Sequence, residues 1–264
     1  MAGAWWGNAQ AQASSTLAAD GEGGSVAKGR LEIDGVALQY LPGLPLALEG
    51  VSVTIPAGDK VGVVGRPGSG KSSLLMAITR MVAPPLRSGS IRLDGQDIDA
   101  LPLLAYRSSI AVVPQDPVLF DGTLRFNLDP LGIHSTEDIW RALQRVQMSH
   151  AVRSLDDHLI GGGAYLPPGQ RQLICIARIM LLKPTLILLD EATSAVDAET
   201  TALIHRTVRA EFAGVTVITI ARSTDTILDA DLILVLDNGR LIESGHPKDL
   251  MAAPRSHFRQ LFAA

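Results

Sequence analysis

A glycine-rich segment carries the residues whose types and spacing point most directly to chemistry. The segment reads Gly65, Arg66, Pro67, Gly68, Ser69, Gly70, Lys71, Ser72 and Ser73. Its first eight residues match the phosphate-binding pattern of glycine, any four residues and then Gly-Lys-Ser/Thr. In such a loop the backbone N–H groups surround a phosphate chain at the positive end of a helix. We therefore expect Lys71 to reach the terminal phosphates and the hydroxyl of Ser72 to bind Mg²⁺.

Two flanking segments must position this loop. The apolar run at 60–64 predicts a buried strand, and the sequence at 73–78 predicts the opening turns of a helix. The order strand, loop, helix is the context that the phosphate-binding motif requires. A glycine-rich surface turn is the plainer interpretation of the loop taken alone.

A second acidic site follows another apolar run. Residues 186–189 are Leu, Ile, Leu and Leu, which predicts a buried strand, and Asp190 and Glu191 come directly after it. Ligands of open α/β sheets bind at such strand ends. We expect Asp190 to hold Mg²⁺ directly or through water, and Glu191 to polarise a water for in-line attack on a γ-phosphate. The alternative is that both acids stabilise a helix N-terminus, which does not explain their pairing with a phosphate loop.

Composition excludes several classes of protein. The chain has 264 residues, of which 47% are hydrophobic, and a net charge of −4, so no overall basic field predicts nucleic-acid binding. No apolar run approaches the ~20 residues that span a bilayer, and the N-terminus lacks a secretory pattern. The single cysteine, Cys175, excludes an intrachain disulfide. The six histidines lack metal-ligand spacing, so we assign no metal beyond Mg²⁺.

The pattern along the chain predicts an α/β fold. Residues 1–29 are rich in Ala, Gly, Ser and Gln and predict a disordered tail or linker. Residues 30–264 predict one domain, with an antiparallel β part first, a helical subdomain at about 115–183 and a finish in which strands and helices alternate. Asp34-Gly35 predicts a turn between two early strands, and Asp237-Asn238-Gly239 a hairpin turn near the end. The phosphate loop indicates that the core is of the P-loop NTPase type.

Several motifs, taken in order, resemble one family, the nucleotide-binding domains of ABC transporters. They are Tyr40-Leu41-Pro42-Gly43-Leu44, the Q-loop-like 113–120, the segment 122–130, Gly169-Gln170-Arg171-Gln172-Leu173 and the 190–197 run. The resemblance covers the chain from about Arg30 to its C-terminus. It is strongest to the C-type, multidrug-resistance-associated subfamily, and within it to the second such domain. It implies an ABC ATPase-type fold that binds ATP and Mg²⁺.

The resemblance also implies roles for individual residues. Tyr40 would stack on adenine; its plainer interpretation is an ordinary strand aromatic. Gln115 would ligate Mg²⁺ and sense the γ-phosphate, whereas a plain surface glutamine is the alternative. Asp197 would cross to a partner domain in a head-to-tail dimer, although it equally suits the N-cap of a helix starting near Ala198.

Two departures from the family pattern affect the expected activity. The signature, usually Leu-Ser-Gly-Gly-Gln, here reads Leu166, Pro167, Pro168, Gly169 and Gln170. Pro167 replaces the serine whose hydroxyl would donate to the partner's γ-phosphate, and neither proline has an N–H. Arg222 stands where the family has a switch histidine; it can donate to a γ-phosphate but cannot act as a neutral imidazole. We expect slower ATP turnover, not lost binding.

Three functions compete. The first is an ATP-binding and hydrolysing domain that powers export across a membrane, at the cytoplasmic face, through transmembrane domains that this chain lacks. The chain would then be a fragment or a separate subunit, paired with a second nucleotide-binding domain. The second is an ATP-binding regulatory module with little turnover. The third, a soluble P-loop ATPase or nucleotide kinase, is disfavoured by Gln115 and by Gly169-Gln170.

Overall fold

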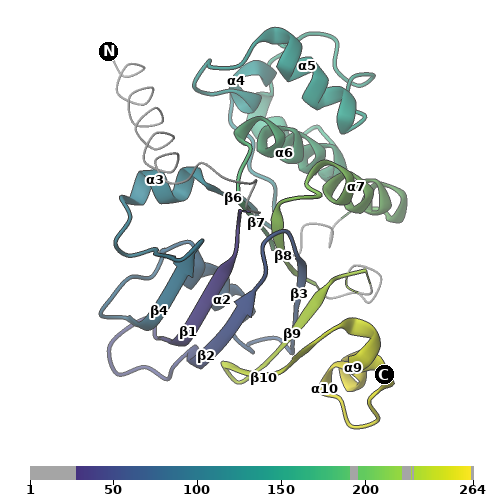
Figure 1. Cartoon of the computed structure of the whole chain (residues 1–264). Coiled ribbons are helices and arrows are strands. Elements are labelled where there is room, and N and C mark those ends of the chain that lie inside the picture. The colour runs from purple at the N-terminus through teal and green to yellow at the C-terminus, as the bar shows by residue number, and fades with distance from the viewer. Residues whose placement is uncertain (1–27, 191–195, 222–226, 228, 263–264) are drawn as a thin grey trace, which may run out of the picture. The chain divides into compact units, whose positions relative to one another are not determined.

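Residues far apart in the chain gather into two units (Figure 1). The computed structural model describes residues 28–190, 196–221, 227 and 229–262. One unit, here called the sheet unit, contains the described residues up to Ile110, the segment from Thr185 to Asp190, and those from Gly214 onward. The other, the helical unit, contains Ala111–Pro184 and the described residues between 196 and 213. Most of the predicted tail at 1–29 lies outside the described residues.

An antiparallel sheet opens the sheet unit. Its strands lie in the order β2 (Leu48–Ile55), β1 (Leu31–Leu38), β4 (Arg87–Leu93) and β5 (Gln96–Asp97). The turn predicted at Asp34-Gly35 is wrong, because β1 runs straight through it and pairs with β2 and β4 on its two sides. The register with both neighbours shifts here, and Gly35 has a φ of 58°. The two residues therefore form a β-bulge, which glycine accommodates without strain.

A mostly parallel sheet completes this unit. In it β10 (Arg240–Gly245), β9 (Leu232–Asp237), β3 (Lys60–Val64), β8 (Thr216–Ile220) and β7 (Leu186–Asp190) follow one another. Strands β9, β3, β8 and β7 pair in parallel, and β10 pairs antiparallel to β9. The predicted β9–β10 hairpin is confirmed: Asn238 and Gly239 both have positive φ, at 46° and 78°, as a tight two-residue hairpin turn requires.

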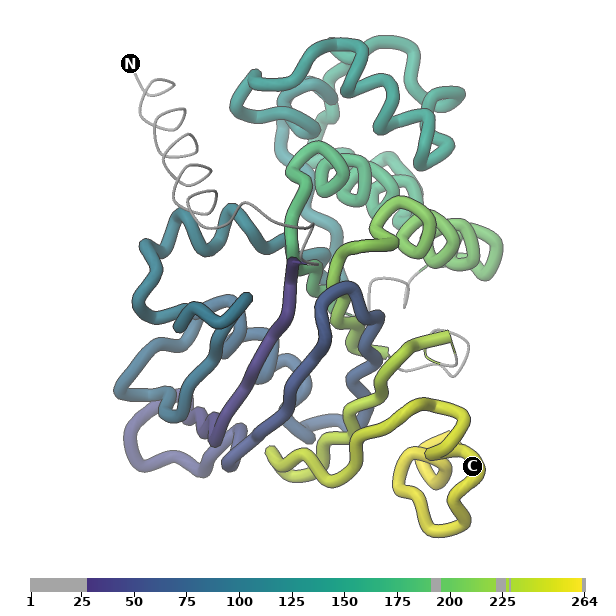
Figure 2. The backbone as a smooth tube through the Cα atoms, in the orientation of Figure 1, coloured from purple at the N-terminus to yellow at the C-terminus, as the bar shows by residue number. Residues whose placement is uncertain are grey.

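Helices cover both faces of this parallel sheet. Helix α2 (Lys71–Ile78) joins one apolar core with both sheets, to which β9 contributes Leu234 and Leu236. The alternate residues of β9, Ile233 and Val235, belong to a second core with Phe258, because successive side chains of a strand point to opposite faces. That core lies under α9 (Pro247–Ala252) and α10 (His257–Phe262), the yellow C-terminal segment in Figure 2.

After β5 the chain forms one more helix in the sheet unit and then enters the helical unit. Helix α3 (Leu103–Ser108) is followed by β6 (Ile110–Val113), with which the chain enters the helical unit. There α4 (Leu124–Leu128), α5 (Thr136–Arg145) and α7 (Ala198–Glu211) contact the long helix α6 (Pro168–Leu182), and a short 3₁₀ turn, η1, covers Ile160–Gly163. Ser135 is the N-cap of α5, since its Oγ accepts from the backbone N–H of Asp138 at 3.1 Å. None of the described helices is both long and apolar enough to cross a membrane.

Candidate phosphate-binding site

The phosphate loop connects β3 to α2. Val61, Val63 and Val64 of β3 are buried, so the loop starts from a fixed strand end. Two glycines are required by close approach: a Cβ on Gly70 would lie 2.7 Å from the carbonyl oxygen of Ala47, and one on Gly65 would collide with the carbonyl oxygen of Leu236. Both also have positive φ, at 102° and 153°. The sequence pattern thus reflects a loop that is packed tightly against neighbouring backbone.

The two loop residues expected to contact phosphate and metal lie at the start of α2. Lys71 Nζ donates to the carbonyl oxygens of Gly65 and Arg66, at 2.8 and 3.0 Å, so the loop curls around its own ammonium group. Ser72, the next residue, is exposed. Gly70 is the N-cap of α2 and supplies no side-chain acceptor to the first N–H groups of the helix. A positive charge, a hydroxyl and helix N–H donors therefore meet in one turn, as phosphate binding requires.

Asp190 lies at the same edge of the parallel sheet as this loop. It is the last residue of β7 and pairs with Ile220 of β8, which in turn pairs with Val63 of β3. Adjacent strands lie about 4.8 Å apart, so the Cα atoms of Asp190 and Val63 are separated by roughly 10 Å. Gly65 follows two residues after Val63. The structure thus brings the predicted carboxylate and the predicted phosphate loop to one sheet edge; Glu191 lies outside the described residues.

Tyr40 lies against the phosphate-loop helix. It follows β1 by two residues, its side chain is 43% exposed, and its hydroxyl lies 2.8 Å from Ser73 Oγ. The interpretation of Tyr40 as an ordinary strand aromatic does not fit, because β1 ends at Leu38 and the ring is not part of the core. No local pattern predicts the contact with Ser73, which joins residues 33 positions apart.

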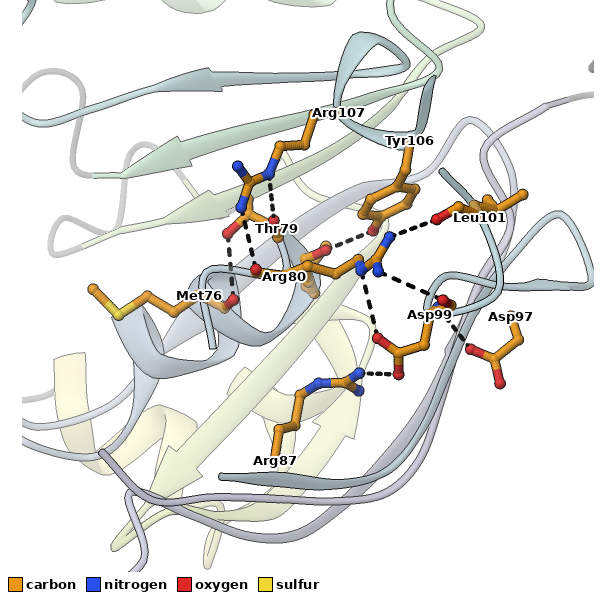
Figure 3. A network of polar contacts seen from close by, with 10 residues as sticks. Met76, Thr79, Arg80, Arg87, Asp97, Asp99, Leu101, Tyr106 and Arg107 are labelled. Carbon is orange, nitrogen blue, oxygen red and sulfur yellow. Dashed lines mark hydrogen bonds and ion pairs between the residues drawn. The ribbon is translucent and has the colours of Figure 1, made fainter. Parts of the chain in front are cut away.

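The far end of α2 is held by side chains that the sequence analysis missed (Figure 3). The hydroxyl of Tyr106 donates to the carbonyl oxygen of Ile78 at 2.5 Å. The guanidinium of Arg107 donates to the carbonyl oxygens of Thr79 and Arg80, at 3.2 and 3.1 Å. Both donors come from α3 and satisfy carbonyl groups that a helix leaves unpaired at its C-terminus. Burial raises the pKa of the Tyr106 hydroxyl above its usual range, so this group stays protonated and donates.

A shared carboxylate extends this network. Asp99 accepts from Arg87, whose side chain is fully buried, and pairs with Arg80 Nε at 3.5 Å. Arg80 also donates to the carbonyl oxygen of Leu101 at 2.8 Å. The segment from β4 to α3 is thereby tied to the end of α2, which fixes the helix that bears Lys71 and Ser72.

The remaining predicted site residues that the structure describes lie in the helical unit. Gln115 follows β6 and is exposed. Of the signature segment, Pro167 is the N-cap of α6 and Pro168 its first residue, so both prolines occupy positions that a helix start tolerates. Leu166 and Gln170 flank these residues and are half-buried. Gly169 is buried so close to α7 that a Cβ would lie 2.6 Å from Thr200 Cγ2.

Asp197 is the N-cap of α7. Its carboxylate accepts from the backbone N–H of Thr200 at 2.9 Å, and hydrogen bonds from the backbone and side chain of Thr200 hold the pKa of Asp197 below its usual value. The capping role that the sequence left open is therefore present, and a role toward a partner domain stays a prediction. Arg222 lies outside the described residues.

Comparison with known proteins agrees with this geometry. A family model described as "ABC transporter" matches residues 48–194. That range contains the phosphate loop, Gln115, the signature segment and Asp190. The chain belongs to the ABC transporter family. The ABC ATPase fold and ATP binding that the sequence predicts are thereby confirmed, and ABC domains of this kind are generally ATPases.

The similar ABC proteins include members of the C-type subfamily, which confirms that prediction. The chain is 44% identical over 237 residues to "ATP-binding cassette sub-family C member 10" of Mus musculus, with 89% of this chain and 16% of that protein covered. It is 44% identical over 239 residues to "ABC transporter C family member 13" of Arabidopsis thaliana, with 89% and 17% covered. The chain therefore spans about a sixth of the length of these curated relatives. A match to their second nucleotide-binding domain stays a prediction.

A solved ABC structure shares the fold. "Structure of a bacterial Atm1-family ABC exporter with ATP bound" superimposes with a TM-score of 0.82 and 32% sequence identity. The match covers 92% of this chain and 43% of the exporter chain.

Proposed function

We propose that this domain binds Mg²⁺-ATP and that hydrolysis of the ATP powers export of a substrate across a membrane. The observation that carries the proposal is the register of the parallel sheet, which brings Asp190 to the same sheet edge as the end of β3, two strands away, from which the phosphate loop emerges. The printed title of the similar solved structure, an ABC exporter with ATP bound, supports the same conclusion.

Each residue has a task in this proposal. Lys71 neutralises the terminal phosphates, and Tyr40 stacks on the adenine. Gln115 contacts the metal and the γ-phosphate, and Glu191 takes a proton from the attacking water. Arg222 donates to the γ-phosphate in place of a histidine.

The residues present suit Mg²⁺. This ion takes hard oxygen ligands, usually one or two from the protein, and keeps several waters and phosphate oxygens. The exposed hydroxyl of Ser72 at the start of α2 and the carboxylate of Asp190 at a strand end are donors of that kind. When bound, the ion would neutralise charge that develops on the phosphates.

The proposal also requires partners. A second nucleotide-binding domain would pair with this one head to tail, so that the signature segment 166–170 and Asp197 face the partner's nucleotide. Transmembrane domains would supply the transport path and hold the pair at the cytoplasmic face of the membrane. Co-purification of the chain with an integral membrane protein tests this arrangement, and its absence from every membrane fraction would contradict it.

Nucleotide binding is tested on the full chain. We expect it to bind ATP in the presence of Mg²⁺, and we expect Lys71→Ala to weaken binding by ten-fold or more, since a hydrogen bond to a charged group contributes about 1.5–3 kcal/mol. Lys60→Ala is the matched control, because Lys60 lies at the opposite end of β3. Equal ATP affinity of wild type and Lys71→Ala would refute the proposed site.

A specific observation favours a second function, that of an ATP-binding regulatory module. Pro167 is the N-cap of α6 and makes no side-chain capping hydrogen bond. Since Pro167 and Pro168 also lack N–H groups, this helix start offers fewer donors to a partner's γ-phosphate than Ser-Gly would. A complete transporter with a competent partner domain separates the two functions by its steady-state phosphate release.

The same phosphate-release assay can test the effect of arginine at position 222, where the family has a histidine. Arg222 can donate to the γ-phosphate but cannot act as a neutral imidazole, and proton transfer by a positioned side chain such as histidine typically contributes ~10²–10⁴-fold in rate. We therefore expect Arg222→His to accelerate phosphate release at this domain's own site. Unchanged turnover in Arg222→His would remove the proposal that Arg222 slows hydrolysis. No measurable turnover in either protein would favour the regulatory module.

A further inference from the structure

The hydroxyl of Tyr40 is held between two side chains of α2. Its Oη lies 2.8 Å from Ser73 Oγ and 3.5 Å from Met76 Sδ. Ser73 and Met76 are three residues apart in the helix, so they lie on the same face. Tyr40 therefore contacts α2 through its hydroxyl.

The two ends of the Tyr40 side chain have different environments. Ser73 is 7% exposed, whereas Tyr40 is 43% exposed. The hydroxyl is thus fixed at a buried anchor while much of the ring remains open to solvent. An exposed tyrosine without such an anchor would sample several rotamers, and a ligand that stacks on it would have to order it first.

The loop that follows Tyr40 is largely open to solvent. Leu41, Leu44 and Leu46, in the loop that follows, are exposed. The backbone is fixed on either side of this loop, where Gln39 N–H donates to the carbonyl oxygen of Leu86 and Ala47 N–H to that of Leu38. The contacts of the hydroxyl with Ser73 and Met76 therefore tie the direction of the ring to α2.

We infer that Ser73 is a positioning residue of the nucleotide site: it holds the ring of Tyr40 at a fixed place relative to the phosphate loop. This inference rests on the proposed function, in which Tyr40 stacks on the base. Lys71, Ser72 and Ser73 are then three successive residues of one helical turn with three tasks, namely to hold the phosphates, the metal and the ring that receives the base. The distance between the base-binding and phosphate-binding positions is set by α2 itself.

The ligand class follows from the chemistry of the contact. A positioned aromatic ring assists any ligand with a base to stack, because every base has a π face. Ser73 therefore contributes more to the binding of nucleoside triphosphates than to the binding of inorganic tripolyphosphate, which has the phosphates without the base. Ordering one side chain costs about 0.5–1.5 kcal/mol, so loss of the anchor raises the Kd for ATP about two- to twelve-fold.

The test compares two ligands on the full chain with Mg²⁺, by equilibrium binding of ATP and of inorganic tripolyphosphate. We expect Ser73→Ala to raise the ratio of the Kd for ATP to the Kd for tripolyphosphate by that factor. Tyr40→Phe keeps the ring and removes the hydroxyl with both of its contacts, so it should weaken ATP binding at least as much. The double variant should be no weaker than Tyr40→Phe, because the contact that Ser73→Ala removes is one of those that Tyr40→Phe already removes.

Thr79→Ala is the matched control. It removes a hydroxyl from the end of the same helix, where Thr79 Oγ1 donates to the carbonyl oxygen of Leu75 at 2.8 Å. We expect it to leave the ratio of the two Kd values at its wild-type value. Equal weakening of both ligands by Ser73→Ala, or additive losses in the double variant, would overturn the inference.

Failure of the proposed function gives a different result. If the wild-type chain bound tripolyphosphate but not ATP, or neither ligand, the nucleotide site itself would be wrong, whatever Ser73 does. If the wild type bound ATP and the Tyr40→Phe chain bound it equally well, the site would stand and the positioning role of Ser73 would be refuted.

Discussion

Replacement of Gly169 by alanine should destabilise the helical unit, against the usual preference of helices for alanine. Gly169 is the second residue of α6 and is buried against the start of α7. An alanine Cβ would lie 2.6 Å from Thr200 Cγ2 and 3.2 Å from Val196 Cγ1. Carbon atoms make favourable contact at about 3.5–4.0 Å, so the two helices would have to separate.

The expected magnitude follows from two opposing terms. Overpacking of a well-packed contact typically costs about 1–3 kcal/mol, and glycine to alanine in a helix contributes up to about 1 kcal/mol in favour of the variant. With the full helix-propensity gain subtracted, the net loss in the free energy of unfolding is about 0–2 kcal/mol. Thr200→Ser removes Cγ2, the nearest atom, and keeps the hydroxyl. It should therefore recover most of the loss in the double variant.

Thermal unfolding of the full chain measures this effect. For a domain of this size, 1 kcal/mol changes the Tm by about 2–4 °C, so Gly169→Ala should lower the Tm and the double variant with Thr200→Ser should restore most of it. Gly214→Ala is a suitable control, because a Cβ there meets no atom within 4 Å. The reasoning is refuted if Gly169→Ala raises the Tm, or if the loss is the same with serine at 200.

Three further outcomes test other contacts. Tyr106→Phe leaves the carbonyl oxygen of Ile78 without its donor and should lower the free energy of urea unfolding by about 1–3 kcal/mol; equal stability would mean that this bond does not hold α2. Ser135→Ala removes the N-cap of α5 and should lower the free energy of unfolding by about 1 kcal/mol. An unchanged free energy of unfolding would contradict the capping role of Ser135. Burial opposes ionisation of Glu243, but donors at the start of α10 outweigh it and lower the pKa of this carboxyl from 4.5. The charged carboxylate therefore stabilises the fold above pH 4.5, and this contribution is lost as the pH falls through the lower native pKa. The Tm of wild type should drop more steeply below that pH than the Tm of Glu243→Gln, and parallel curves would contradict this role.

Local patterns predicted the phosphate loop, the strand that ends in Asp190 and the β9–β10 hairpin. Each depends on residues that are adjacent in sequence: a glycine spacing, an apolar run followed by an acid, and the Asn238-Gly239 pair. The C-terminal ends of parallel strands meet at one edge, so the common location of loop and carboxylate could also be inferred.

Features that depend on distant pairing could not be predicted. Asp34-Gly35 has the sequence of a hairpin turn, yet β1 continues through it, because strands on both sides pair with it. The sequence marks Arg87 as a surface residue, since arginine is almost never fully buried unless it is paired; its partner Asp99 lies twelve positions away. The contact between Tyr40 and Ser73 likewise requires the fold.

The most direct test of the account is ATP binding by the purified full chain with and without Mg²⁺, compared between wild type and Asp190→Asn. We predict that wild type binds ATP more tightly with Mg²⁺ than without it, and that Asp190→Asn removes most of this difference. If Mg²⁺ strengthened ATP binding equally in both proteins, Asp190 would not act on the metal beside the phosphate loop, and the central claim would be wrong.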